Sequence, residues 1–321
     1  MTSPVLKSLA KYAVNLNLDR LAGRCFEKAS SQRFQVVGYH KVSPDPHPFF
    51  EPVEPRIFEK QMEFLKDCYN VVELQDLVAR SQRGELPERA VAITFDDGYR
   101  DNYDYAFPIL KKLGLPATIF VATAAVGNAK ILWHDRIFDA FRFATMKPER
   151  ADLLKPKLNS TLDKARRLYG NALIEFVEQI EAELKPDYTE RQRASMLTWS
   201  QIREMHAAGI QFGSHTVNHP ILSRLRREDI EVELQQSQAE LSSKLRAPVT
   251  SFAYPNGRAA DYNDEVKTAL KRCGYTCAVT ARTGFNTSTT DPFEIRRGRP
   301  WHNEIELFRF SFLMQRHGLA S

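Results

Sequence analysis

The chain has 321 residues, 43% of them hydrophobic and 26% charged, which is the composition of an ordinary globular protein with one large domain or two small ones. Its 45 Lys and Arg against 40 Asp and Glu give a net charge of +5, too small to indicate a nucleic-acid partner. The four cysteines form no CxxC pair, so reduced thiols are expected rather than a disulfide scaffold or a cysteine-rich zinc site.

The first 33 residues are predicted to form a segment of their own. Apolar residues recur at helical spacing over 3–29, with Lys7 and Lys11 between them, which predicts an amphipathic helix. Such a helix fits the outside of a folded domain, the alternative we favour, or a membrane surface. The chain shows no signal-peptide pattern and no run of about 20 apolar residues. We therefore expect a cytoplasmic protein, with contact at the inner membrane face as a further expectation.

From residue 34 onward, short apolar strands alternate with helical patterns. Strands are predicted over 34–39, 69–74, 90–95, 117–122, 210–213, 250–254, 276–280 and 294–296. Helices are predicted over 57–65, 102–113, 200–208, 227–245 and 265–273. This repetition of strand, helix and parallel strand predicts an α/β barrel or a doubly wound sheet. The strand signals stop over 131–199, which we interpret as a helical insertion in a single domain spanning 34–321.

Two adjacent carboxylates stand at the end of the strand predicted over 90–95. Residues 94–99 read TFDDGY, so Asp96 and Asp97 follow the apolar run and a glycine comes next. Active sites of α/β barrels and sheets lie at the carboxyl ends of their strands. One carboxylate can bind a cation while its neighbour remains free as a base. A helix N-cap followed by a turn would explain the same three residues.

Two histidines follow another predicted strand. Residues 214–219 read SHTVNH, which places His215 and His219 four residues apart, on one face of a predicted helical turn. Together with one carboxylate they would complete a three-ligand metal site that leaves a position open to water, as catalytic zinc sites do. Thr216 and Asn218 are expected to shape this turn, and Ser214 is expected to cap it.

Together these motifs resemble the polysaccharide deacetylase family, the NodB-homology domain of carbohydrate esterases. Residues 94–99 and 214–219 are similar to its first two motifs, and 252–257 (FAYPNG) to a variant of the third. Residues 39–42 (YHKV) and 108–121 are similar as well, most closely to the branch that handles exopolysaccharides and poly-N-acetylglucosamine. The resemblance covers about 35–300 apart from the insertion, and it implies a distorted (β/α)7 barrel.

The resemblance also implies roles for individual residues. Asp97, His215 and His219 match the metal ligands, and Asp96 matches the general base. By the same analogy, the backbone N–H of Tyr254 stabilises the oxyanion, and Tyr254 and Pro255 line the sugar site. A site of two histidines and one aspartate suits zinc best, with cobalt, nickel or iron as alternatives.

Three of the expected parts have no clear match. The arginine that orients the base is absent from 251–253, and Arg296, Arg297 or Arg299 could replace it, of which we favour Arg296. The general acid is expected to be His302 or His40. His134 is expected to act as a lid or substrate contact, and one tryptophan is expected to stack on a sugar, with Trp133 favoured over Trp199 and Trp301.

The sequence thus predicts a metal-dependent hydrolase that removes the N-acetyl group of an N-acetylhexosamine in a polysaccharide, an oligosaccharide or a lipid-linked precursor. One alternative is a hydrolase of small cyclic amides or imides on the same scaffold. The other is a non-catalytic carbohydrate-binding protein. The expected partner is an N-acetylated glycan and not a nucleic acid, and the sequence leaves the oligomeric state open.

Overall fold

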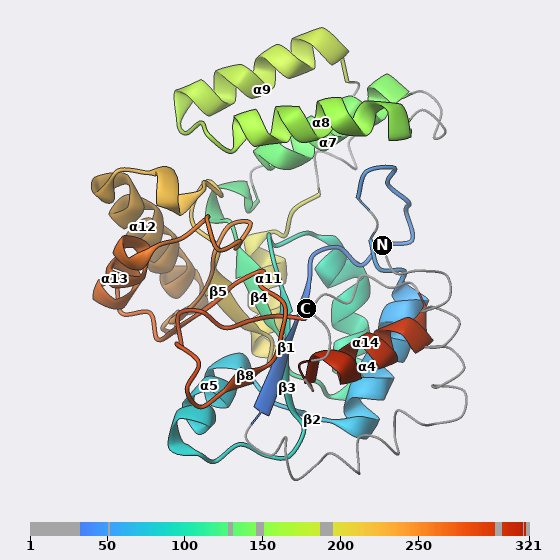
Figure 1. Cartoon of the computed structure of the whole chain (residues 1–321), viewed down its shortest axis with the longest axis vertical. Helices are drawn as coiled ribbons and strands as arrows, with labels where there is room; N and C mark the ends of the chain where they lie inside the picture. The colour runs from blue at the N-terminus through green and yellow to red at the C-terminus, as the bar shows by residue number, and fades with distance from the viewer. Residues whose placement is uncertain are drawn as a thin grey trace.

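A curled, mostly parallel β-sheet forms the centre of the molecule (Figure 1). The computed structural model describes residues 33–50, 52–127, 131–145, 151–186, 195–298, 304–316 and 318. The strand order is β7-β6-β5-β4-β3-β1-β8, with β2 paired to β3. The strands are β1 (Arg33–Tyr39), β2 (Asn70–Val71), β3 (Ala90–Phe95), β4 (Thr118–Val121), β5 (Gln211–Ser214), β6 (Ser251–Ala253), β7 (Cys277–Val279) and β8 (Asn286–Thr287). The strand predicted over 69–74 is reduced to β2, because a helix begins at Leu74.

Most of the central strands are buried on both faces. Every residue of β3 and β4 is buried, as is typical of parallel strands covered by helices. In β1, residues 35–39 pair in parallel with residues 91–95 of β3, so the two strands end side by side at Tyr39 and Phe95. The residues that come next, His40 and Asp96, therefore leave the sheet at the same edge.

A short segment near the end of the chain, residues 295–298, closes the gap between β7 and β1, and we refer to it as the closing segment. Ile295 forms a parallel bridge with Val279 of β7, and Gly298 forms another with Val37 of β1. Backbone hydrogen bonds join both pairs, including Gly298 N to Val36 O at 2.7 Å and Gly38 N to Gly298 O at 3.0 Å. The sheet is thereby curled into the distorted barrel that the sequence predicts.

Helices cover the outside of this barrel. In Figure 1, α4 and α14 lie together on one side of the sheet, and α12 and α13 lie on the other. The outer helices are α4 (Pro55–Cys68), α5 (Leu74–Arg83), α6 (Phe107–Leu113), α11 (Trp199–Ala207), α12 (Arg227–Leu245), α13 (Asp264–Arg272) and α14 (Ile305–Arg316). A π-helix, Asn102–Ala106, precedes α6 within the helix predicted over 102–113.

Three helices between β4 and α11 form a layer above the barrel, at the top of Figure 1. These are α7 (Trp133–Thr145), α8 (Ala151–Ala165) and α9 (Asn171–Leu184). They share an apolar cluster that includes Ile137, Phe141, Leu162 and Val177. They fall within the predicted insertion of 131–199, and we refer to α7, α8 and α9 as the insertion helices.

Residues 1–32 lie outside the described residues, so the amphipathic helix predicted over 3–29 and its contact with a membrane stay predictions. Among the helices of the described ranges, none combines the length and the apolar character needed to cross a bilayer. Cys273 and Cys277 are free thiols, in agreement with the expectation for these two positions.

Candidate metal centre and active site

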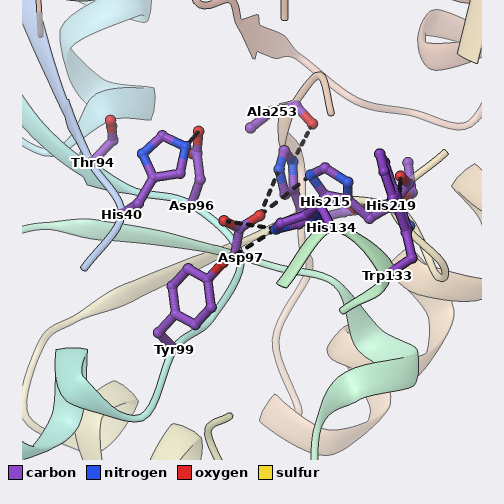
Figure 2. A network of polar contacts seen from close by, with 12 residues as sticks. His40, Thr94, Asp96, Asp97, Tyr99, Trp133, His134, His215, His219 and Ala253 are labelled. Carbon is purple, nitrogen blue, oxygen red and sulfur yellow. Dashed lines mark hydrogen bonds and ion pairs between the residues drawn. The ribbon is translucent and has the colours of Figure 1, made fainter. Parts of the chain in front are cut away.

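The two carboxylates that follow β3 point to different partners. Asp96 and Asp97 are 3% and 2% exposed, so both charges are removed from bulk water. The backbone turns sharply between them and the next helix, because Asp97 and Gly98 both have φ in the left-handed region, at 75° and 79°. As a result Asp96 faces Arg297. Asp97 instead faces a group of histidines, as Figure 2 shows.

Asp97, His215 and His219 form a compact cluster of metal-ligating atoms. Their ligand atoms all lie within 4.8 Å of one another, and all three residues are buried. Asp97 Oδ1 is 3.4 Å from His215 Nε2 and 3.3 Å from His219 Nε2. The structure therefore brings together the three residues predicted as metal ligands.

The two histidines reach this cluster from a loop and not from a helical turn, so that part of the prediction is wrong. β5 ends at Ser214, and the following residues form bends, with Thr216 at φ 69° and His219 at φ 57°. A non-glycine residue held in this region costs on the order of 1–3 kcal/mol and persists only where its surroundings hold it. Thr216 N donates to Ser214 Oγ at 3.3 Å, which agrees with the expectation that Ser214 caps the turn.

Hydrogen bonding around His215 shows that these residues fit a divalent cation. His215 Nδ1 lies 2.7 Å from the carbonyl oxygen of Ala253, which can only accept, so Nδ1 carries the proton. In the neutral ring Nε2 then presents a lone pair to Asp97 Oδ1, a buried atom without a hydrogen-bond partner among the described residues. Two facing acceptors need a positive charge between them, and the nitrogen and oxygen donors suit Zn²⁺, Co²⁺, Ni²⁺ or Fe²⁺.

The charges at this cluster also favour a cation. Burial raises the pKa of Asp97, but the neighbouring imidazoles of His215 and His219 outweigh burial and hold that pKa well below its usual range. Burial lowers the pKa of His215, yet Asp97 and Asp96 together raise it above its ordinary value. Asp97 is therefore a carboxylate at neutral pH, and a bound cation would displace the proton that His215 otherwise attracts.

Asp96 is held by a bidentate ion pair with Arg297. Arg297 Nη1 donates to Asp96 Oδ1 at 2.7 Å, and Nη2 donates to Oδ2 at 2.6 Å. Burial raises the pKa of Asp96, but Arg297 lowers that pKa by more than burial raises it. The pKa of Asp96 therefore lies below its ordinary value. Gly38 leaves room for the guanidinium, since a Cβ there would be 3.3 Å from Arg297 Cδ, Nε and Nη1. The Asp96 carboxylate is thus ionised and fixed in orientation.

The preference for Arg296 as the orienting arginine is wrong by one residue. Arg296 is exposed, and its backbone pairs with the side chain of Asn286, whereas Arg297 is 4% exposed. Side chains of an extended segment alternate between two faces, so neighbouring arginines on the closing segment point in opposite directions. Arg299, the third candidate, lies outside the described residues.

Two further histidines flank the carboxylates. His40 Nε2 lies 3.8 Å from Asp96 Oδ2, and burial lowers the pKa of His40 despite the nearby aspartates. His134, from α7, lies with Nε2 4.0 Å from Asp97 Oδ2 and 3.2 Å from the hydroxyl of Tyr99. Burial lowers the pKa of His134 to about 4, so this ring is neutral at neutral pH. His302, the other candidate for the general acid, lies outside the described residues.

These groups surround one cavity of about 230 Å³. Its walls come from the barrel and from α7, and they combine charged, polar and aromatic side chains. The lining residues include His40, Phe50, Asp96, Asp97, Tyr99, His134, Phe138, His215, His219, Asn256, Arg258 and Arg297. Phe50, Tyr99 and Phe138 contribute aromatic rings to this lining, and the sequence analysis did not expect a ring contact from any of them.

Tyr254 and Pro255 do not line this cavity, so the prediction for them is wrong. The backbone N–H of Tyr254 already donates to Val279 O at 3.2 Å, which removes it as an oxyanion donor. The Tyr254 ring stacks on Tyr262 at 4.4 Å in an apolar cluster. Instead Asn256 lines the cavity, and its Nδ2 is buried without a hydrogen-bond partner among the described residues.

Trp133 is also placed differently from the prediction. It is 9% exposed, belongs to the apolar cluster of the insertion helices and is not among the residues that line the cavity. Its indole Nε1 donates to the carbonyl oxygen of His219 at 3.0 Å, so it supports the loop that carries His215 and His219 and does not line the cavity. Trp199 packs against the core of the barrel, and Trp301 lies outside the described residues.

Replacing Tyr254 with Phe tests its structural placement. The hydroxyl donates to Phe293 O at 2.9 Å, and its removal leaves a buried carbonyl oxygen without this donor. We expect the free energy of unfolding to fall by about 1–2 kcal/mol, measured by denaturant titration. We expect kcat and KM for the hydrolysed substrate to stay unchanged. A large fall in kcat with unchanged stability would contradict this placement and would indicate that the Tyr254 ring contacts the substrate.

Comparisons with known proteins agree with this geometry. A model of the polysaccharide deacetylase family matches residues 83–278. The protein YxkH of Bacillus subtilis (strain 168), provisionally named a polysaccharide deacetylase, is 25% identical over 269 residues, which cover 83% of this chain and 71% of YxkH. The poly-beta-1,6-N-acetyl-D-glucosamine N-deacetylase of Staphylococcus epidermidis is 26% identical over 172 residues, which cover 49% of this chain and 58% of that protein.

Solved structures share the fold. The deacetylase PplD of Streptococcus pyogenes superimposes with a TM-score of 0.60 at 24% identity, covering 87% of this chain and 98% of PplD. IcaB from Ammonifex degensii superimposes with a TM-score of 0.61 at 20% identity, covering 88% of this chain and 97% of IcaB. The match of the family model over 83–278, on a barrel of the same fold, shows that this chain belongs to the polysaccharide deacetylase family of hydrolases.

Proposed function

We propose that this protein is a metal-dependent N-deacetylase that hydrolyses the N-acetyl group of N-acetylhexosamine units in a glycan. The observation that carries the proposal is that one cavity contains both a three-ligand cluster and a separate, ionised carboxylate. The cluster is Asp97, His215 and His219, and the carboxylate is Asp96. The relative in Staphylococcus epidermidis named as a poly-beta-1,6-N-acetyl-D-glucosamine N-deacetylase supports the choice of substrate class.

Asp97, His215 and His219 would hold the cation, most suitably Zn²⁺. When bound there, a divalent cation supplies Lewis-acid polarisation of the amide carbonyl and of water. Asp96 takes the proton as water attacks the carbonyl carbon. Arg297 keeps Asp96 ionised and aims both of its oxygens. A base fixed by two hydrogen bonds loses little entropy on reaching the reactive geometry.

The remaining polar groups of the cavity suit the later proton transfer and the developing charge. His40, 3.8 Å from Asp96, is a neutral imidazole that can accept the proton from the base and deliver it to the departing amine nitrogen. The Asn256 amide can donate to the carbonyl oxygen as negative charge develops on it. The rings of Phe50, Tyr99 and Phe138 offer apolar faces to the sugar.

Acetate release tests this proposal directly. N-acetylglucosamine oligomers, a lipid-linked N-acetylglucosamine and the cyclic imide succinimide are incubated with the enzyme, before and after treatment with a chelator. We expect acetate from at least one glycan, complete loss after chelation, and recovery on addition of Zn²⁺ or Co²⁺. A His219→Ala variant serves as the control that lacks one ligand. Acetate release that survives chelation, or turnover of the imide alone, would contradict the proposal.

A further inference from the structure

Glu233 is a buried carboxylate that contacts the metal-binding loop from behind. It lies on α12 and is 1% exposed, and it takes part in none of the salt bridges found between described residues. Its Oε2 accepts hydrogen bonds from Val217 N at 2.8 Å and Asn218 N at 2.9 Å. Its Oε1 accepts from Asn218 Nδ2 at 2.8 Å and from the hydroxyl of Tyr169 at 3.2 Å. Four donors, none of them cationic, thus satisfy one buried charge.

The two backbone bonds fall between the two ligating histidines. Val217 and Asn218 lie, together with Thr216, between His215 and His219. Two of the loop residues, Thr216 and His219, have left-handed backbone conformations. Hydrogen bonds from N–H groups to a carboxylate are stronger than those to a neutral acceptor. The Glu233 carboxylate accepts from the N–H groups of both Val217 and Asn218, and it therefore opposes relaxation of the loop. Relaxation of the loop would carry His219 Nε2 away from Asp97.

The insertion helices reach the same loop at two points. Tyr169 lies between α8 and α9, and burial, followed by the charge of Glu233, raises the pKa of Tyr169 to about 12, so the phenol stays protonated and donates. Trp133, the first residue of α7, donates its indole N–H to the carbonyl oxygen of His219. The layer of insertion helices thus contacts this loop directly through α7, and through Glu233 from the connection between α8 and α9.

We propose that Glu233 is a positioning residue that fixes the metal-binding loop, and that the insertion helices strengthen metal binding through Tyr169. This proposal rests on the metal site of the proposed function. It predicts that the affinity for the cation depends on two residues that do not touch it. Such partners of metal ligands typically change affinity about 10- to 100-fold when they are altered.

Cobalt binding to the full chain provides the test. In Glu233→Gln the amide keeps one acceptor but places an NH₂ group against N–H donors, so we expect the Kd for Co²⁺, measured by titration calorimetry, to rise about 10- to 100-fold. We also expect the visible absorption bands of the bound cobalt to shift. Tyr169→Phe removes one of the four donors, and we expect its Kd to rise roughly 3- to 10-fold, as for a single hydrogen bond.

Two control variants carry the same two substitutions, Glu to Gln and Tyr to Phe, at positions away from the proposed metal site. Glu228→Gln changes an exposed glutamate on the same helix, and Tyr103→Phe removes a tyrosine-to-glutamate bond, to Glu204 at 2.8 Å. Both should bind cobalt as the wild type does. A folded Glu233→Gln with wild-type Kd and spectrum overturns the positioning role, even if its metal-free form is less stable. If Glu233→Gln does not fold, an unchanged Kd in Tyr169→Phe overturns it. A wild type that binds no cobalt overturns the proposed function as well.

Discussion

Replacing Asp96 with Asn is expected to lower kcat for acetate release by about 10²- to 10⁴-fold, the usual contribution of a general base. The amide cannot accept the proton, and it cannot form two charge-assisted bonds with Arg297. The cation should remain bound, because its three ligands are unchanged. Steady-state kinetics, together with the metal content of the purified variant, measure both effects.

Two further variants make this result interpretable. His215→Ala should lose both the cation and the activity, because it removes one of three ligands. Asp104→Asn, at an exposed aspartate paired with Arg100, should behave as the wild type in both respects. Full activity in Asp96→Asn would contradict the assignment of Asp96 as the base, and loss of metal in that variant would move Asp96 into the ligand set.

Replacing Arg297 with Met is expected to reduce the free energy of unfolding by about 3–5 kcal/mol, because it leaves Asp96 buried without its counter-charge. The activity should fall as well, since the base loses its orientation and the charge that keeps it ionised. Denaturant titration and steady-state kinetics measure the two effects. Arg297→Lys should recover only part of each, because one ammonium group cannot form a bidentate pair.

The neighbouring arginine offers a matched control. Arg296→Met removes the same charge from an exposed position one residue away, so we expect a change of stability within about 0.5 kcal/mol and normal activity. If both variants lose stability and activity to the same extent, the ion pair between Asp96 and Arg297 is not what orients the base. If only Arg296→Met is damaged, the closing segment must present the other arginine to the site.

The parts of the site that could be predicted from the sequence lie next to strong local signals. The β-branched run before Asp96 predicts the strand, and parallel strands bring their carboxyl ends to one edge. His215 follows a strand of the same sheet, so its meeting with Asp97 follows from the same rule. These inferences need only the order of the elements along the chain.

The inferences that were wrong depend on how individual residues are oriented. Ile295 is buried, so the alternation along the closing segment places Arg297, and not Arg296, on the inner face. That signal was present in the sequence, since a strand was predicted over 294–296, but only the bridges to β7 and β1 show which neighbours the segment has and therefore which face is inner. Tyr254 donates to β7 beyond the end of β6, which occupies its N–H. No glycine marks the left-handed positions of the loop at 215–219.

Glu233 is an exception to the apolar pattern of α12, and such an exception can be found in the sequence. Ile230, Leu234 and Leu241 form the buried face of α12, and Glu233 lies on that face. A charged residue among apolar positions breaks the local rule, and such exceptions tend to occur at functional sites. The partner of Glu233 could not be identified, because the contact crosses from a helix to a loop on the barrel edge.

The ion pair of the base also has a consequence for biosynthesis. Asp96 and Arg297 are 201 residues apart, so a ribosome that adds about 5–20 residues per second needs roughly 10–40 s to pass from one to the other. During that interval the residues of β3 have been synthesised, but Arg297, which pairs with the carboxylate at the end of β3, has not. The nascent chain therefore cannot complete its catalytic base until the closing segment has emerged, which makes hydrolytic competence one of the last properties acquired during translation.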